Sequence, residues 1–230
     1  MSLFDGFTLS HPSSEHTNLQ TGFNFPQSLT EKYRPKTFEE FAGMDKQKRI
    51  LTNFARNPYP TAFLFVGAPG TGKTCAGIAL AQAIPAEVHH IPSQECNVSN
   101  IERRMYTCHM VPASGFKMHL VLVDEADQMS TAAQLLLLSK LDGTAFPPNT
   151  VFVFTCNAVD RLEDRFLSRC KVLEFSTYGL AADAVSLLAR VWQTEAPSGS
   201  ESPNFARIVK ESNNNVRESL QRLETELLAI

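Results

Sequence analysis

Gly67-Ala68-Pro69-Gly70-Thr71-Gly72-Lys73-Thr74 is the most informative stretch of this sequence, because it matches the pattern GxxxxGK[ST] in full. Glycines at these positions let backbone N–H groups curl around phosphate oxygens. In this pattern the lysine reaches the terminal phosphates of a nucleotide, and the threonine hydroxyl can bind Mg²⁺. The alternative is a glycine-rich turn with an incidental lysine, so the flanking sequence has to distinguish the two.

The segments on either side favour the nucleotide interpretation. TAFLFVG (61–67) predicts a buried strand that runs into the turn, and KTCAGIALAQAI (73–84) predicts a helix that stops before Pro85. A helix that begins here adds its dipole to the attraction for phosphate. We therefore predict a P-loop that binds ATP together with Mg²⁺.

Further apolar segments extend this unit into a sheet. HLVLVDEAD (119–127), TVFVFTCN (150–157) and KVLEF (171–175) predict strands, and TAAQLLLLSKLDG (131–143) predicts a helix between the first two. Alternating strands and helices predict an α/β fold, with a parallel P-loop sheet flanked by helices. Polar residues collect where three of the strands end, which is typical of the ligand crevice of such a sheet.

The remainder of the chain divides into three parts by composition. Residues 1–28 are polar with isolated aromatics and show no periodicity, which predicts a flexible tail. Residues 29–178 contain the strands and form the predicted nucleotide-binding domain. Helical patterns near 179–193, 203–212 and 215–229 predict a small all-α lid domain over 179–230.

Three polar residues follow the predicted strands and suggest a reaction. Asp124 is placed to bind the Mg²⁺, and Glu125 is placed to position an attacking water. Asn157 ends the next strand, where its amide could orient that water or contact the γ-phosphate, or where it could be a turn residue. A complete set of this kind predicts hydrolysis of the bound nucleotide.

Composition limits the class of protein. The 21 basic and 24 acidic residues give a formal charge of -3, so any contact with DNA must be local. No apolar run approaches the ~20 residues of a membrane helix, and the first residues lack a basic region followed by an apolar one. We expect no membrane contact and a soluble intracellular protein, cytoplasmic or, in a eukaryote, nuclear.

The cysteines do not predict a disulfide framework. They are five in number and lack CxxC spacing, which also argues against a zinc ribbon and favours a reducing compartment. Other combinations of possible metal ligands fit no zinc pattern, so the sequence assigns no structural metal. The residues considered for such a site were His89, His90, Cys96, Cys108 and His109.

The motifs together resemble those of AAA+ ATPases, and among these the small subunits of sliding-clamp loaders, the replication factor C group. The resemblance covers roughly residues 30–230, and the SRC tripeptide after DEAD and TCN is its most specific part. The motifs are EKYRPKTFEEFAG (31–43), GAPGTGKT (67–74), Asp124-Glu125-Ala126-Asp127, Thr155-Cys156-Asn157 and Ser168-Arg169-Cys170.

The resemblance implies roles for residues outside the P-loop. Arg169 corresponds to an arginine finger that reaches the γ-phosphate bound by the next subunit. Arg217 resembles the sensor-2 arginine of the lid, which contacts the nucleotide of its own subunit. Tyr33, Arg34 and Pro35 lie in the segment that lines the adenine pocket in this family.

The function implied is that of an ATP-hydrolysing subunit of a clamp-loader-like oligomeric machine in DNA replication or repair. Its partners would be other AAA+ subunits, identical or different, and DNA or a DNA-bound protein such as a sliding clamp. Two features depart from the family. The sequence ends at Ile230 without a helical collar, and LLLLSK (135–140) stands where the family often has arginines. Arg103, Arg104 and Lys117 could face DNA or solvent.

Several alternatives share the same core. RPKTFEEFAG (34–43) also looks like the opening of the bacterial Holliday-junction motor, and helicase loaders and transposition regulators are related possibilities. A subunit that holds ATP without hydrolysing it is the rival from a non-enzymatic class, although Lys73, Asp124 and Glu125 argue against it. A small-molecule kinase is less consistent with an SRC segment and a helical lid.

Overall fold

The structure, a computed structural model that describes residues 26–230, contains a five-stranded parallel sheet. The strand order is β2-β3-β4-β1-β5, which confirms the predicted P-loop sheet. The strands are β1 (Thr61–Val66), β2 (Ala86–Ile91), β3 (Met118–Val123), β4 (Thr150–Cys156) and β5 (Lys171–Glu174).

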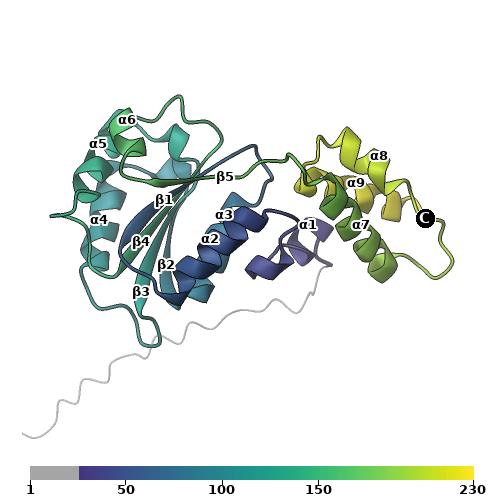
Figure 1. Cartoon of the computed structure of the whole chain (residues 1–230), viewed down its shortest axis with the longest axis horizontal. Coiled ribbons are helices and arrows are strands. Elements are labelled where there is room, and N and C mark those ends of the chain that lie inside the picture. The colour runs from purple at the N-terminus through teal and green to yellow at the C-terminus, as the bar shows by residue number, and fades with distance from the viewer. Residues whose placement is uncertain (1–25) are drawn as a thin grey trace, which may run out of the picture.

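Helices cover both faces of this sheet (Figure 1). Alternate residues of β1 and β4 point in opposite directions. Phe63 and Val153 join the apolar cluster of α2 and α3, and Leu64 and Phe154 join that of α4 and α5. A strand buried on both faces is a continuous apolar run, which explains why β1, β3 and β4 were predictable. The helices that precede α7 (Ala181–Glu195) are α1 (Leu29–Lys32), which packs with the C-terminal helices, and α2 (Asp45–Arg56), α3 (Lys73–Ala83), α4 (Val98–Cys108), α5 (Thr131–Lys140) and α6 (Asp164–Leu167), with 3₁₀ turns η1 (Phe38–Glu40), η2 (Ser93–Glu95) and η3 (Ala126–Gln128).

The sequence prediction missed the helices α2 and α4 and the strand β2, together with the short helices α1 and α6 and the 3₁₀ turns. The sequence of β2, AEVHHI, mixes polar and apolar residues because it lies at the edge of the sheet. Helices α2 and α4 are amphipathic and bury few residues each, among them Leu51 and Phe54 in α2 and Ile101 and Met105 in α4. The missed strand β2 matters because two residues of the candidate site described below, His90 and Ser93, lie at or just after its carboxyl end.

The C-terminal helices form a separate cluster beside the sheet (Figure 1). They are α7 (Ala181–Glu195), α8 (Phe205–Glu211) and α9 (Val216–Leu228), close to the predicted helical ranges. Leu188, Trp192 and Leu223 pack in their shared core. The division into domains 29–178 and 179–230 is retained as a proposal, and most of the predicted 1–28 tail lies outside the described residues. Among residues 26–230, no helix has both the length and the apolar character required to cross a membrane.

Candidate nucleotide-binding site

The candidate site lies where β1, β3 and β4 end. The register pairs Val66 with Cys156 and Val123 with Phe154, so the loops after these strands leave the sheet along one edge. Buried apolar strands fix the positions of these loops, because any slip of register would exchange side chains between the two packed faces of the sheet. The polar residues that follow the strands are therefore brought together by the folding of the sheet.

The P-loop has a backbone that only glycine allows at two positions. Gly70 has φ +76, and a Cβ there would collide with the side-chain amide of Asn215. A Cβ at Gly67 would collide with the carbonyl oxygen of Phe175. The hydroxyl of Thr71 donates to Ala68 O at 2.8 Å and holds the loop closed, and α3 begins directly afterwards at Lys73. This arrangement aims free N–H groups and the positive end of α3 into the loop.

Lys73 is buried within this loop. Its Nζ donates to Gly67 O at 2.6 Å, to Ala68 O at 2.9 Å and to Asn157 Oδ1 at 3.1 Å. Burial lowers the pKa of Lys73 below the ordinary lysine value, because a buried ammonium loses hydration. The structure thus brings Lys73 and Asn157 together, which places the Asn157 amide beside the cation rather than in an isolated turn.

Asp124 accepts hydrogen bonds from three elements. Its Oδ1 accepts from Thr74 Oγ1 at 2.9 Å and from Thr155 Oγ1 at 3.0 Å. Its Oδ2 lies 2.7 Å from Nε2 of His90, the fifth residue of β2. Because the carboxylate and the Thr74 hydroxyl are already in contact, both can bind one Mg²⁺, which prefers oxygen ligands.

Glu125 adopts an unusual backbone conformation. Its φ is +52, a left-handed value that is uncommon for residues other than glycine. The backbone N–H of Glu125 donates to Thr155 Oγ1 at 3.1 Å, and its side-chain Oε2 accepts from Ser93 Oγ at 3.1 Å. These two contacts hold an exposed carboxylate at the rim of the site. Sequence reasoning missed both Ser93 and His90, because it did not identify β2.

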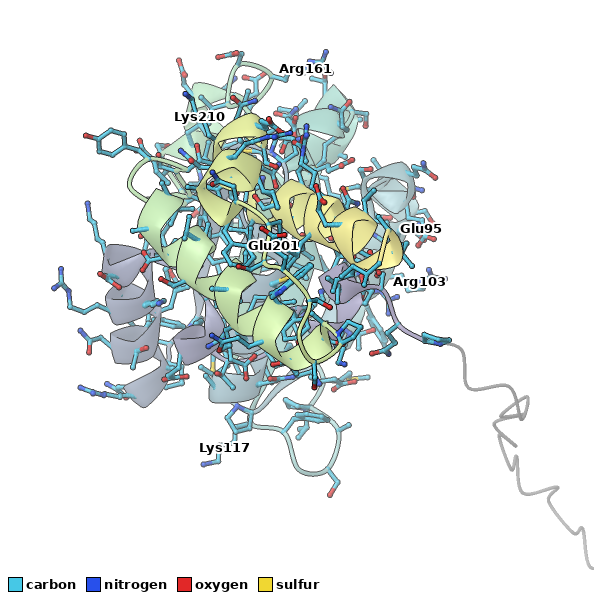
Figure 2. The ribbon with its side chains drawn as sticks, turned by 90° about the vertical axis from the view of Figure 1, so that its right-hand side faces the viewer. Glu95, Arg103, Lys117, Arg161, Glu201 and Lys210 are labelled. Carbon is cyan, nitrogen blue, oxygen red and sulfur yellow. The ribbon has the colours of Figure 1, made fainter. Side chains whose placement is uncertain are left out.

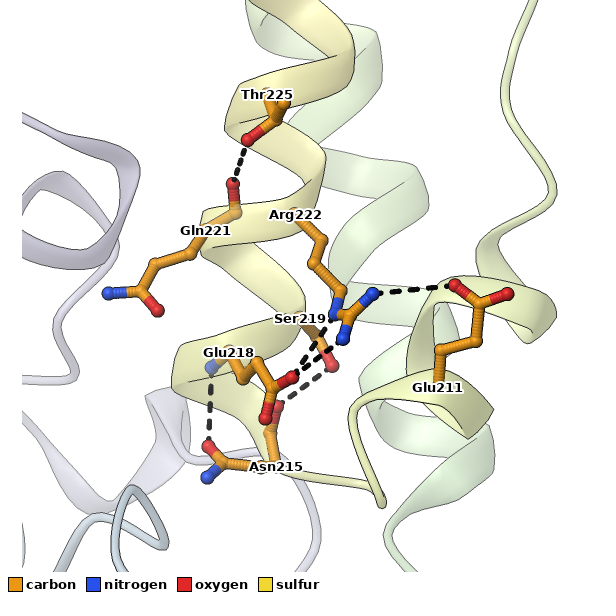
Figure 3. A network of polar contacts seen from close by, with 7 residues as sticks. All are labelled: Glu211, Asn215, Glu218, Ser219, Gln221, Arg222 and Thr225. Atoms are coloured by element: carbon orange, nitrogen blue, oxygen red, sulfur yellow. Dashed lines mark hydrogen bonds and ion pairs between the residues drawn. The ribbon is translucent and has the colours of Figure 1, made fainter.

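The lid contacts the P-loop through the start of α9. Asn215 Nδ2 donates to Pro69 O at 2.9 Å, while its Oδ1 accepts from the N–H of Glu218 and caps the helix (Figure 3). Arg217, one residue into α9, lines the cavity shared by Lys73, Asp124 and Asn157. Arg222, further along α9, binds Glu218 at 2.9 Å and Glu211 of α8 at 3.4 Å, which joins the two lid helices (Figure 3).

A second cavity adjoins the first and is more apolar. Its lining includes Tyr33, Arg34 and Pro35 on one side and Val216 and Leu220 of α9 on the other. Both cavities share Gly70, Gly72, Cys75 and Arg217, so they are continuous around the P-loop. An apolar pocket next to a phosphate-binding loop fits the base of a nucleotide.

The segment that contains Tyr33 and Arg34 is held by contacts to the lid and to α3. The hydroxyl of Tyr33 donates to Glu195 Oε1 in α7, and Lys32 Nζ donates to Glu195 Oε2 at 2.9 Å. Burial raises the pKa of Tyr33, and the bond to Glu195 raises it further. Arg34 Nε lies 3.3 Å from Cys75 Sγ. The segment before the sheet therefore depends on contacts to two other elements.

Arg169 lies apart from both cavities. Its Nη1 donates to Arg165 O at 3.0 Å, and its Nη2 lies 3.8 Å from a carboxylate oxygen of Asp142. The side chain is 33% exposed, at the turn between α6 and β5. The residues that line the two nucleotide cavities do not include Arg169, so this guanidinium has no contact with the site of its own chain.

A comparison with protein families matches residues 63–178 to the ATPase family associated with various cellular activities (AAA). Among curated proteins, replication factor C small subunit 1 of Pyrobaculum arsenaticum is 35% identical over 153 residues, which are 64% of this chain and 46% of the relative. Replication factor C small subunit of Thermofilum pendens is 30% identical over 201 residues, 84% of this chain and 61% of the relative. The chain thus spans about half to three fifths of the length of these relatives.

Among solved structures, the Thermotoga maritima RuvB Holliday junction branch migration motor superposes with a TM-score of 0.66. The alignment covers 84% of this chain and 64% of that chain at 20% sequence identity. A likeness at this identity is informative about the fold alone. It agrees with the parallel sheet and the helices that flank it.

Proposed function

Because this chain belongs to the AAA family of ATPases, we propose that it binds ATP with Mg²⁺ and hydrolyses it at the edge of the sheet described above. The observation that supports this most directly is the hydrogen bond between Thr74 and Asp124, with Lys73 and Asn157 in contact beside it. A hydroxyl, a carboxylate and a buried ammonium gathered at one P-loop are the groups that phosphoryl transfer requires.

The residues divide the chemical work in the following way. The P-loop amides and Lys73 bind the β- and γ-phosphates, and the second cavity takes the adenine and ribose. Thr74 and Asp124 hold the Mg²⁺, which neutralises charge that develops on the phosphates. Glu125 orients and polarises the attacking water and accepts its proton, and Asn157 fixes the position of the γ-phosphate or of the water.

A complete site requires a group from a second subunit. Arg169 has no contact with the nucleotide cavities of its own chain and is partly exposed at a surface turn. Arg217 supplies a cation from the same chain, whereas Arg169 is available to an adjacent one. We expect an arginine delivered in this manner to raise the rate by ~10³ or more.

The test measures ATPase rate against protein concentration. The rate per subunit should rise with concentration in the wild type, because hydrolysis needs a neighbour. The variant Arg169→Ala should lose turnover and keep its affinity for ATP, while a variant of the exposed Arg165 in the preceding helix α6, Arg165→Ala, should keep both. Full activity of Arg169→Ala at all concentrations would refute the shared site without affecting the proposal that the chain binds ATP.

The wider proposal is a subunit of a clamp-loader-like machine in DNA replication or repair. It rests on the replication factor C small subunits, which match this chain at 30–35% identity, whereas RuvB matches in fold alone. The partners would be other AAA+ subunits and a DNA-bound ring protein. Figure 2 shows Arg103, Lys117, Arg161 and Lys210 well apart from one another, so these four basic residues do not form one DNA-binding surface in that view.

Two measurements test this wider proposal. Size determination with and without a slowly hydrolysed ATP analogue should show ATP-dependent assembly. The ATPase rate should then rise with a sliding clamp and primed DNA, and a four-way junction should have less effect. Stimulation by the junction alone would favour the branch-migration alternative. A complete assembly that binds ATP without turnover would favour the non-catalytic alternative.

A further inference from the structure

Three buried side chains that can bind metals converge on the α4 side of the sheet. They are His89 of β2, Cys108 at the last position of α4, and His119 of β3, and their ligand atoms all lie within 4.8 Å of one another. All three side chains are buried, with 5%, 0% and 1% of their surfaces exposed. The register pairs Glu87 with His119 and His89 with Val121, so the two imidazoles lie diagonally on one face of the sheet.

The hydrogen bonds of His119 fix a tautomer in which Nδ1 has a lone pair that faces His89 Nε2 at 2.9 Å and could bind a metal instead. The Nε2 of His119 lies 3.0 Å from the carbonyl oxygen of Met110, which can only accept, so this nitrogen bears the proton. The lone pair of Nδ1 therefore points into the cluster. A ligating histidine in proteins commonly donates its other N–H to a carbonyl in this way, which fixes the tautomer and the ring orientation.

The spacing of the ligand atoms fits a tetrahedral ion after a small adjustment. His89 Nε2 and His119 Nδ1 are 2.9 Å apart, and two nitrogens bound to one tetrahedral zinc lie ~3.3 Å apart, since each bond is ~2.0 Å. Side-chain rotation on two adjacent strands can supply this difference. The thiol sulfur at the end of α4 provides the third corner of the tetrahedron.

We propose that His89, Cys108 and His119 form a binding site for Zn²⁺, and that the carboxylate of Glu87, which lies outside this 4.8 Å group and accepts from Ala113 N–H at 2.9 Å, moves toward the ion to become the fourth ligand. Glu87 Oε2 lies 3.6 Å from His119 Nδ1, and its side chain is 30% exposed, so it connects the buried cluster to solvent and offers a route of entry. Two imidazoles, a thiolate and a carboxylate suit zinc, whereas Mg²⁺ and Ca²⁺ prefer sites made of oxygen ligands.

Zinc binding requires the release of one proton and the movement of another within the site. The Cys108 thiol releases its proton to solvent and binds as thiolate, and the proton on His89 Nε2 moves to Nδ1 so that Nε2 can bind. Burial lowers the pKa of His89 and raises the pKa of Cys108 to about 11, because both charged forms lose hydration. Zinc offsets the second effect because it stabilises the thiolate directly.

This site is separate from the nucleotide site and does not depend on the proposed function. His119 is five residues before Asp124 on the same strand and loop, a separation of ~16 Å at ~3.3 Å per residue. The ion would join the edge strand β2 and its neighbour β3 to the end of α4. We therefore expect a structural role, with stability rather than turnover as its readout.

The experiment uses the full chain and Co²⁺ or Zn²⁺ alone as the probe. Co²⁺ should give a thiolate-to-metal charge-transfer band and the strong visible bands of tetrahedral coordination. Zn²⁺ in excess should remove these bands and raise the midpoint of thermal unfolding by about 5 °C, because it binds only the folded state. The variant Cys108→Ser should lose the charge-transfer band and at least tenfold in Zn²⁺ affinity.

Cys96→Ser is the matched control. Cys96 is also buried, and burial raises its pKa to about 11 as well, but it is outside the cluster. This variant should keep the cobalt spectrum and the zinc-induced shift. If Cys108→Ser fails to fold, His119→Gln and Glu87→Gln can be compared with Cys96→Ser instead. Both variants should lose Zn²⁺ affinity, and His119→Gln should lose more than Glu87→Gln. Wild-type protein without a charge-transfer band, or with an equal band in Cys96→Ser and Cys108→Ser, overturns the proposal.

Discussion

The nucleotide site has two sides that are held in different ways. On the sheet side, Lys73, Asp124 and Asn157 follow strands that are buried on both faces, and each has at least one short hydrogen bond to a neighbouring element. On the lid side, Asn215 joins the lid to the P-loop through Pro69 O, and Glu195 of α7 holds Lys32 and Tyr33 of the α1 segment, which packs against the lid helices. The sheet side is fixed by the core of the fold, whereas the contact of Asn215 between the lid and the P-loop is polar.

This difference suggests a division of roles. A group that must meet the γ-phosphate within a fraction of an ångström benefits from a rigid support. A lid that must open to exchange nucleotide benefits from contacts that are individually weak. Mutations on the sheet side should therefore change chemistry and binding strongly, and mutations on the lid side should cause smaller, graded effects.

The largest effect is expected from Glu125→Gln. The substitution keeps the size of the side chain and can still contact Ser93, but it removes the carboxylate that accepts a proton from water. We expect turnover to fall by about 1,000-fold with ATP affinity unchanged. Single-turnover hydrolysis and equilibrium binding measure the two quantities. If Glu125→Gln hydrolyses ATP at the wild-type rate, the role assigned to this carboxylate is wrong.

Lys73→Ala should mainly affect binding. The variant removes a buried ammonium that donates to two P-loop carbonyls and to Asn157, and with it the contact to the terminal phosphates. We expect ATP affinity to fall by about 100-fold, the value of a lost charged hydrogen bond. Titration with a fluorescent ATP analogue measures this loss. Lys48→Ala on α2 is a control, since Lys48 is part of neither nucleotide cavity.

The residues of the sheet side can be predicted from sequence because each lies in or next to a short segment with a recognisable pattern. GAPGTGKT can be recognised as a P-loop because a strand segment precedes it and a helical segment follows it. Asp124 and Asn157 can be recognised because each directly follows an apolar strand segment. The residues that were missed, Ser93 and His90, lie on or just after β2, whose mixed sequence gives no strand signal. Local pattern identifies the buried strands and also the edge strand β5, and it fails at the more polar edge strand β2.

The cluster of His89, Cys108 and His119 is not evident from the sequence for a related reason. His89 and Cys108 were considered as ligands on spacing along the chain, and His119 was assigned only to a strand. The parallel pairing of β2 with β3 brings His89 and His119 together across 30 residues. Pairing between strands so far apart in sequence depends on the whole fold, so no short motif could indicate it.

Asn215→Ala tests the lid side, with a smaller expected effect. The variant removes the bond to Pro69 and the cap of α9, which should lower stability by about 1 kcal/mol and ATP affinity by about fivefold. Asn204→Ala is a matched control, because Asn204 caps α8 in the same manner and bonds Arg207 of that helix, whereas Asn215 also bonds the P-loop. Asn204→Ala should lower the free energy of unfolding by a similar amount and leave ATP affinity unchanged. If Asn215→Ala and Asn204→Ala lose the same ATP affinity, the contact between Asn215 and Pro69 has no specific role in nucleotide binding.

The smallest effect is expected from Glu195→Gln, which weakens the contact between α7 and the segment before the sheet. The hydrogen bond from Lys32, and then that from Tyr33, lower the pKa of Glu195 below the ordinary carboxyl value. A lowered pKa in the folded state means that the stabilisation is complete above the ordinary value and is lost as the pH falls through the lowered one. The unfolding midpoint of Glu195→Gln should be about 1–2 °C below wild type at neutral pH and should converge with it in acid, since solvent screens an exposed pair. Glu226→Gln, at an exposed position on α9, should match the wild type throughout. A difference that persists undiminished in acid would show that Glu195 acts by packing rather than charge, and the lid would then be held more like the sheet side than we propose.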